Sequence, residues 1–211
     1  MKSFADIDKR LPLTHTLLRS VRVLGEYKGK ETLYSEQTPQ TLKTLREMAV
    51  IQSTESSNRI EGVTAPSERI RDLVTKKTKP RDRSEQEIAG YRDVLNTIHG
   101  NHEGMKLSPN LIRQLHRDLF RYTDGKGGAW KASQNLITEK RANGTERVRF
   151  APVEPHLVPN AMEELHRGFA QVWEEDRIDR LLLIPAYVLD FLCIHPFSDG
   201  NGRMARLLSL L

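Results

Sequence analysis

Apolar side chains recur every three or four residues along most of this chain, which places them on one face of an α-helix. Helices of this kind are stable when their apolar faces pack together, and 211 residues are enough for one good-sized core. We therefore expect a mainly α fold, a bundle of helices. The pattern predicts helices over residues 41–51, 67–74, 84–98, 108–120, 154–175 and 178–194, and a further helix from residue 202.

Local signals indicate where several of these helices begin. Thr38 and Pro39 precede the first segment, and Ser108 stands before a proline at the start of the fourth. Ser84 and Glu87 have the Ser-x-x-Glu spacing of a capping box, which predicts that Ser84 caps the third helix.

One segment breaks the helical pattern. Residues 134–138 and 147–150 are short β-compatible runs, and Asn143-Gly144 lies between them. Asn-Gly is favoured in the tight turns of β-hairpins, because both central positions of such a turn have positive φ. Residues 134–150 are therefore interpreted as one β-hairpin inserted into the helical bundle, with a disordered loop as the alternative.

Composition limits the cellular setting. The chain lacks the roughly 18 consecutive apolar residues of a membrane helix, and its first residues lack the apolar run of a signal peptide. Cys193 is the only cysteine, which excludes an intramolecular disulfide. These features favour a soluble, cytoplasmic protein with no membrane partner. The formal net charge of +5 favours anionic partners, such as nucleotides or acidic proteins.

The segment after the last long helix carries the densest set of chemical groups. Pro196 disfavours helix at the residue before it, so the helix should stop at His195 and leave that imidazole at an exposed tip. Gly200 and Gly202 allow backbone N–H groups to approach a ligand closely at the start of the next helix. This arrangement predicts an anion site beside a candidate general base.

Charged side chains in the same segment extend this prediction. Arg203 and Arg206 lie three residues apart, so we expect them on one face of the new helix, where both could reach phosphate oxygens. Asp199 adds a carboxylate next to the anion site, and proteins often hold Mg²⁺ with a nucleotide in this way.

These residues resemble the complete motif of the Fic family, His-x-Phe-x-(Asp/Glu)-Gly-Asn-Gly-(Arg/Lys)-x-x-Arg. The resemblance implies a compact helical fold and transfer of AMP from ATP to a Ser, Thr or Tyr hydroxyl of a target protein. It implies that His195 deprotonates the hydroxyl, that Asp199 binds Mg²⁺, and that Phe197 anchors the loop in the core. It implies a nucleotide site that comprises His195, Gly200, Asn201, Gly202, Arg203, Met204 and Arg206.

A second stretch is similar to the inhibitory motif of the same family, (Ser/Thr)-x-x-x-Glu-(Gly/Asn). Ser57 and Glu61 lie four residues apart, on one side of a helical turn, and Gly62 is a typical helix terminator. The resemblance implies an inhibitory helix over about 52–62, in which Glu61 pairs with Arg206 and blocks the site for the γ-phosphate of ATP.

The resemblance also sets expectations for organisation and partners. We expect an N-terminal helical region over 1–80 and a catalytic core over 81–211 that continues into further C-terminal helices or a winged-helix module. Adenine-pocket residues would then lie beyond Leu211, and nucleic acid would be a partner only if a winged-helix module follows. The hairpin at 134–150 would act as a flap that holds the target segment, and self-modification is also expected.

Two alternatives to AMP transfer stay open at this point. The first keeps an enzyme of the same fold, which uses another donor or removes AMP from modified proteins. The second is a basic module that binds nucleotide or nucleic acid without catalysis. Such a module would need a clustered basic face with interleaved aromatic residues, whereas only 6% of the residues are aromatic.

Overall fold

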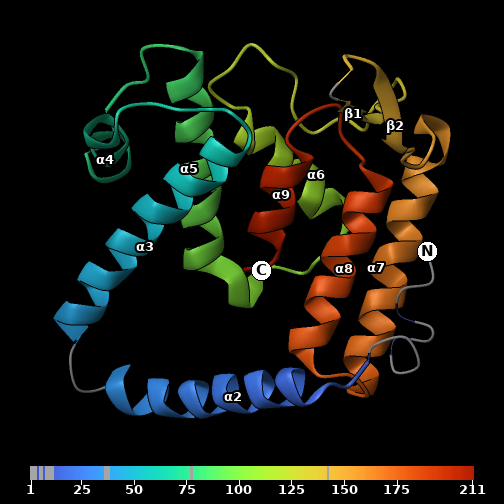
Figure 1. The fold of residues 1–211 in the computed structure, drawn as a ribbon. Coiled ribbons are helices and arrows are strands. Elements are labelled where there is room, and N and C mark those ends of the chain that lie inside the picture. The colour runs from blue at the N-terminus through green and yellow to red at the C-terminus, as the bar shows by residue number, and fades with distance from the viewer. Residues whose placement is uncertain (1–3, 5–6, 8–11, 36–38, 77, 142) are drawn as a thin grey trace.

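The computed structural model describes the chain except for residues 1–3, 5–6, 8–11, 36–38, 77 and 142. The described part is mainly helical, with one antiparallel pair of strands, so the predicted fold class is confirmed (Figure 1). Its helices are α2 (His15–Ser35), α3 (Pro39–Ile60), α4 (Ser67–Thr75), α5 (Arg83–Asn101), α6 (Pro109–Leu119), α7 (Val158–Glu175), α8 (Arg180–Ile194) and α9 (Asn201–Leu208), with short 3₁₀ turns at His102–Gly104 and Pro155–Leu157.

Helix α9 occupies a central position in the bundle. It lies between α5 and α8 and contacts both, and the end of α3 also packs against it (Figure 1). The core around it is largely apolar. Its completely buried side chains include Ile88, Leu95, Leu119, Phe191, Ile194, Phe197, Met204 and Leu207.

Several helices differ from the sequence-based prediction. The predicted helix over 41–51 and the predicted inhibitory helix over 52–62 form one continuous element, α3, while Thr38 lies outside the described residues. Helix α2 was not predicted, because its apolar residues are scattered and many of them, such as Leu18 and Leu24, are exposed.

The predicted capping box at the start of α5 is wrong. The helix begins one residue earlier, and the Asp82 carboxylate accepts the N–H of Glu85 at 2.9 Å. Ser108 does cap α6 as predicted, since its hydroxyl accepts the N–H of Leu111 at 3.2 Å. Because Asp82 already serves as the cap, Glu87 is free to turn inward toward α9.

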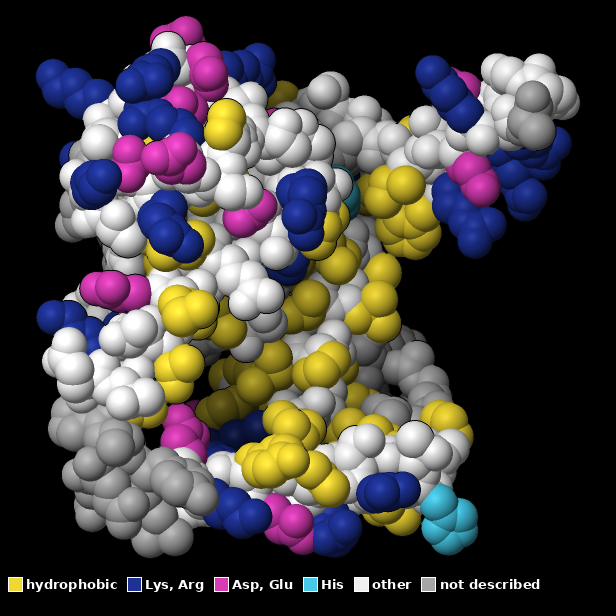
Figure 2. All heavy atoms as spheres, turned by 60° about the vertical axis from the view of Figure 1, so that its left-hand side comes forward, with side chains coloured by type: hydrophobic (Ala, Val, Ile, Leu, Met, Phe, Trp, Pro, Cys, Tyr) yellow, Lys and Arg dark blue, Asp and Glu magenta, His cyan; other side chains and the backbone are white. Residues whose placement is uncertain are grey.

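The predicted hairpin is confirmed, with its first strand shifted by a few residues. Strands β1 (Ile137–Lys140) and β2 (Glu146–Phe150) pair antiparallel, and Gly144 takes the positive φ of 81° that the turn requires. Every residue of both strands is exposed, and the hairpin projects from the body of the molecule (Figure 2). Both strands are therefore accessible to another chain.

Within the described part of the chain, no helix has both the length and the apolar character needed to cross a membrane.

Candidate active site

The end of α8 presents His195 to the site. Its backbone is left-handed, with φ 51° and ψ 61°, because the following proline prevents continuation of the helix. Ring atom Nδ1 lies 3.3 Å from the carbonyl oxygen of Leu192. A carbonyl can only accept, so Nδ1 carries the proton and Nε2 retains its lone pair. Burial is the main cause that lowers the pKa of His195 below its ordinary 6.5, which favours the neutral imidazole.

The loop after His195 is fastened to the core at Phe197, whose side chain is completely buried, as the resemblance implies. The Phe197 N–H donates to Oδ1 of Asn201 at 3.0 Å, and Nδ2 of Asn201 donates back to the Phe197 carbonyl at 2.7 Å. The Phe197 ring stacks on His116, with ring centroids 3.6 Å apart and planes within 4°. The loop is thus held from both its backbone and its side-chain face.

His116, on α6, also fixes the backbone of Asp199. Gly128 donates its N–H to Nδ1 of His116 at 2.8 Å, so Nε2 carries the proton and donates to the Asp199 carbonyl at 3.0 Å. Burial lowers the pKa of His116 to about 4, so the imidazole is neutral at pH 7 and this bridging tautomer persists.

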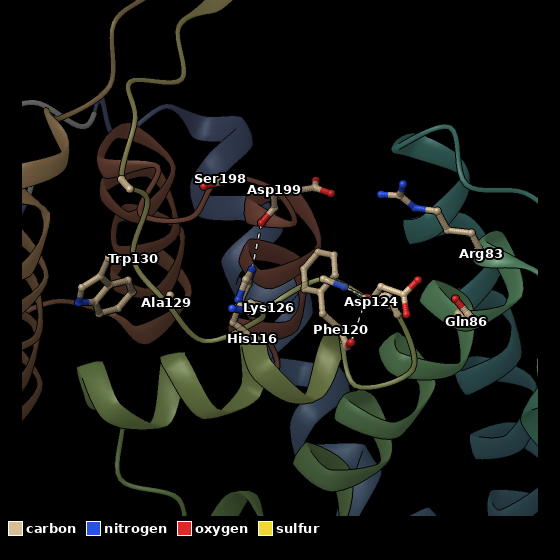
Figure 3. A pocket seen from close by; sticks show the side chains of 13 residues that line it. Arg83, Gln86, His116, Phe120, Asp124, Lys126, Ala129, Trp130, Ser198 and Asp199 are labelled. Atoms are coloured by element: carbon tan, nitrogen blue, oxygen red, sulfur yellow. Dashed lines mark hydrogen bonds between the residues drawn. The ribbon is translucent and has the colours of Figure 1, made fainter.

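The Asp199 carboxylate faces outward. Its side chain is 64% exposed, and it points across a cavity of about 560 Å³ toward Arg83 (Figure 3). Oδ1 accepts the N–H of Gly200 at 2.6 Å, while Oδ2 lies 3.7 Å from Arg203. Among the described residues, no group of three or more His, Cys, Asp or Glu side chains could hold a metal. Any ion here would therefore take most of its ligands from a substrate or from water.

Glycines allow close approach at the N-terminus of α9. Gly200 has φ 78°, and a Cβ there would lie 2.9 Å from the Phe120 ring. A Cβ on Gly202 would lie 2.3 Å from Oε1 of Glu61. The Glu61 carboxylate therefore lies directly against the first turn of α9, where the helix dipole and free N–H groups favour negative charge.

Arg206 binds the end of α3 through three hydrogen bonds. Its Nη2 donates to Oε1 of Glu61 at 2.6 Å and to the carbonyl of Ser57 at 2.9 Å, and its Nε donates to the Ser57 hydroxyl at 2.7 Å. The structure thus brings Glu61 and Arg206 together, as expected for one residue from each sequence motif, across 145 positions of the chain.

The end of α3 has the geometry that places Glu61 there. Helix α3 finishes in a Schellman motif: Val63 N–H donates to the Asn58 carbonyl and Gly62 N–H donates to the Arg59 carbonyl, both at 3.0 Å. Gly62 has φ 76°, a left-handed conformation that glycine adopts without strain. Glu61 is the last residue before this turn, so its side chain projects from the helix end.

Arg203 is directed to a different partner from Arg206, although only three residues separate the two on α9. Its side chain is 2% exposed, and Nη1 donates to Oε2 of Glu87 on α5 at 2.6 Å. The guanidinium also lies over the Phe120 ring, 5.2 Å from its centroid. The two arginines have different partners because α9 contacts both α5, which carries Glu87, and the end of α3, which Glu61 follows.

Met204 is also placed differently from the prediction. It is completely buried in the core, and its N–H donates to the Gly200 carbonyl within α9. Neither its side chain nor its N–H is available to a nucleotide in this arrangement. The methionine packs the helix that carries the site.

Sequence reasoning missed three residues that support the site: Glu87, His116 and Lys131. Each comes from a segment far from the motif, and each is almost completely buried despite its polar side chain. Helical spacing does put Glu87 and His116 next to apolar core positions. This position beside the core is the only sign in the sequence that the two side chains are buried, and it does not predict which partner each of them binds.

Comparison with protein families gives one match that covers half of the chain. The model of the Fic/DOC family matches residues 106–211, which include His195 and the whole loop that follows it. A 30-residue stretch is 57% identical to the ribonucleoside-diphosphate reductase small chain of Ostreid herpesvirus 1, but it covers only 14% of this chain and 5% of that protein. That overlap is too short to indicate a shared fold.

Solved structures with a similar fold agree with the family match. A Fic domain-containing signaling protein from Bacteroides thetaiotaomicron superposes with a TM-score of 0.70 at 23% identity, over 81% of this chain and 64% of that one. A Fic family protein from Desulfovibrio desulfuricans superposes with a TM-score of 0.71 at 21% identity, over 94% of this chain and 57% of that one. Fic-1 from C. elegans superposes with a TM-score of 0.63 at 18% identity, over 92% of this chain and 59% of that one. The chain thus spans less than two thirds of each of these proteins.

Proposed function

Because this chain belongs to the Fic/DOC family, we propose that it transfers AMP from ATP to a Ser, Thr or Tyr hydroxyl of a target protein and that Glu61 inhibits this transfer. The observation that carries the proposal is the position of the Glu61 carboxylate. It pairs with Arg206 at 2.6 Å and lies against Gly202, at a helix N-terminus built to receive an anion. A negatively charged phosphate would compete for the same place.

His195 is the general base in this proposal. Its Nε2 would accept the proton of the target hydroxyl while the hydroxyl oxygen attacks the α-phosphorus of ATP. A new oxygen–phosphorus bond forms, the bond from the α-phosphorus to the bridging oxygen breaks, and pyrophosphate leaves in line with the attacking oxygen. The hydrogen bond from Nδ1 to Leu192 keeps the ring in the tautomer that this step needs.

The phosphates would lie along the first turn of α9. The backbone N–H groups of Asn201 and Gly202 would act as donors, and Arg206 would bind the terminal phosphate after Glu61 leaves it. Arg203 would support this turn through Glu87 and supply positive potential from inside the core.

Asp199 fits a role as a ligand of Mg²⁺. Its carboxylate is a hard oxygen donor, is exposed, and lies beside the proposed phosphate site, while one of its oxygens has no closer cation than Arg203 at 3.7 Å. When bound, the ion would neutralise charge on the phosphates. The absence of a metal-binding cluster in the described residues is compatible with an ion held mainly by the nucleotide and water.

The hairpin would hold the target. Every residue of both strands is exposed, so an extended segment could pair with a strand edge and bring its hydroxyl to His195 without strict sequence requirements. A segment of another copy of the chain could bind in the same way, which would produce self-modification.

The decisive experiment measures transfer of radioactivity from α-labelled ATP into protein, with Mg²⁺ and a cell lysate as the target source. The variants are wild type, Glu61→Gly, and Glu61→Gly with His195→Ala, and Glu103→Gly serves as the matched control because Glu103 is exposed and remote from the site. Labelling should increase about 10- to 100-fold in Glu61→Gly only, and the added His195→Ala should abolish it. Absence of labelling by folded Glu61→Gly would refute self-inhibited AMP transfer.

Two further measurements separate AMP transfer from the alternatives within the fold. Replacing ATP by GTP, CTP or UTP tests another donor. Incubating the wild type with AMP-labelled protein tests removal of AMP, in which Glu61 would position a water. Transfer from ATP to the exclusion of the other donors, with the label retained on the protein, would support the proposal.

The pH profile provides an independent check on the base. The reactive form of His195 is the neutral ring, so kcat/KM of Glu61→Gly should rise with pH through the pKa of that ring and then level off. Since burial lowers this pKa, the plateau should be reached at a lower pH than for an imidazole with the ordinary pKa of 6.5. A flat profile from pH 5 to 8 with chemistry rate-limiting would contradict the role of His195.

A further inference from the structure

A buried lysine lies directly behind the candidate base. Lys131 is in the loop between α6 and β1, and it is only 3% exposed. An ammonium group removed from water is costly unless its protons are bonded. The Lys131 Nζ donates to Oδ1 of Asn135 at 2.6 Å and reaches the carbonyl oxygen of Ile194 at 3.5 Å. The Lys131 ammonium group is thus held by neutral oxygens, and Lys131 takes part in none of the ion pairs between described residues.

Lys131 and Asn135 together bind the backbone on both sides of His195. The Lys131 N–H donates to the Pro196 carbonyl at 2.8 Å, and Nδ2 of Asn135 donates to the Phe197 carbonyl at 2.9 Å. With the contact from Nζ to Ile194, the pair engages three carbonyls within four consecutive residues. His195 lies in the middle of this span with a left-handed backbone, which a residue with a Cβ adopts only when its surroundings impose it.

The positive charge of Lys131 also acts on the imidazole. Two charged side chains influence His195: Lys131 from the loop lowers its pKa, and Glu61 from the end of α3 raises it. Burial lowers the pKa of Lys131 itself, through desolvation. If Glu61 moves away from the site, Lys131 is the one of these two side chains that still acts on the imidazole. Its positive charge disfavours protonation of His195, because protonation would place a second positive charge beside it.

From these contacts we infer that Lys131 is a positioning residue for His195, which holds the backbone on both sides of the imidazole and places a positive charge behind it. The effect of Lys131 on catalysis rests on the proposed function, whereas its effect on the position and pKa of the His195 imidazole does not. The lysine thus helps keep the base ready to accept a proton, and Asn135 is the residue that keeps the ammonium in place.

The test is an NMR titration of the His195 imidazole in the free protein, which needs no transfer activity. Lys131→Met keeps the length of the side chain and removes the charge, so the pKa of His195 should rise by about 0.5 to 1. Lys131→Arg should restore the wild-type value. Lys106→Met is the matched control, since Lys106 is exposed and distant in the chain from the loop, and it should leave the titration unchanged.

A second variant covers the case in which Lys131→Met does not fold. Asn135→Asp is nearly isosteric and places a carboxylate on Nζ, which offsets the positive charge and should also raise the pKa of His195. In the Glu61→Gly background, the acidic limb of the kcat/KM profile should move to higher pH in the same direction. An unchanged His195 pKa in either folded variant would overturn the inference. Loss of AMP transfer in every protein, with the pKa changes still present, would refute only the proposed function.

Discussion

Helix α9 carries two arginine–glutamate pairs of equal length that differ in their surroundings. Arg203 meets Glu87 at 2.6 Å on the side of α5, with side chains 2% and 8% exposed. Arg206 meets Glu61 at the same distance on the side of α3, with side chains 31% and 34% exposed. A buried pair cannot separate without leaving a charge without compensation, whereas a partly exposed pair can exchange its partner for water or phosphate.

In our proposal, α9 has a fixed side, at the buried Arg203–Glu87 pair, and an exchangeable side, at the partly exposed Arg206–Glu61 pair. On the fixed side, Arg203 also lies over Phe120, and His116 holds the neighbouring loop. On the exchangeable side, the acidic partner is Glu61, at the end of α3. The same type of contact thus serves stability in one place and, in our proposal, regulation in the other.

The largest expected effect is on the fixed side. Glu87→Ala would leave the Arg203 guanidinium buried without its acid, so the free energy of unfolding should decrease by about 3–5 kcal/mol. Urea unfolding followed by circular dichroism measures this change, and Glu87→Gln gives a milder variant if the alanine protein does not fold.

Arg83→Met is the control for that prediction. Arg83 contacts the same Glu87 carboxylate at 3.1 Å, but its side chain is 80% exposed, so its loss should cost less than about 1 kcal/mol. Equal losses for Glu87→Ala and Arg83→Met would show that burial does not distinguish these contacts.

The next effect concerns pH. His116 has a pKa of about 4 in the folded protein, against an ordinary 6.5, so the unfolded chain takes up a proton first as the pH falls. Its contribution to stability is present above pH 6.5 and is lost between pH 6.5 and 4, by on the order of 3 kcal/mol. Urea unfolding at pH 7, 6 and 5 should show this decrease.

Two substitutions isolate the contribution of His116. In His116→Gln the decrease with pH should be smaller, whereas His156→Gln, at an exposed position, should behave like the wild type. Identical pH dependence in all three proteins would contradict a buried neutral ring at position 116.

On the exchangeable side, stability and activity should separate. Glu61→Gln removes the charge of the acid while keeping its shape, and the pair is about one-third exposed, so the free energy of unfolding should change by less than about 1 kcal/mol. ATP binding, measured by calorimetry, should nevertheless tighten about 10-fold or more, because the carboxylate no longer competes with phosphate. A large loss of stability with unchanged ATP affinity would make Glu61 a structural residue.

The smallest effect on activity is expected at the helix end that carries Glu61. Gly62→Ala meets no atom within 4 Å, but φ 76° strains any residue with a Cβ, so unfolding should become easier by about 1–2 kcal/mol. Some of that strain should loosen Glu61 and raise AMP transfer a few-fold. Gly100→Ala, a helical site with equal space, should show neither change, and a similar result for both glycines would remove the role assigned to the turn.

Sequence reasoning succeeded where the cause is local. Asn143-Gly144 predicts the hairpin turn, Ser108 predicts the start of α6, and His195-Pro196 predicts the end of α8, because each depends on backbone sterics or a hydrogen bond within a few residues. It failed at Ser84, because Asp82, two residues earlier, could also cap the helix and is the residue that does so.

The amino-acid sequence by itself determined the elements and the chemical groups available to the site: the end of α8 at His195, the glycine turn into α9, and the helix end at Glu61 and Gly62. Only the tertiary structure decided how these groups are used. Arg203 and Arg206 are the same residue type on one helix, yet one pairs with an acid 116 positions away in the core and the other with an acid at the surface. The reason is physical, since burial and partners depend on which helices pack against each side of α9, and no local pattern encodes that choice.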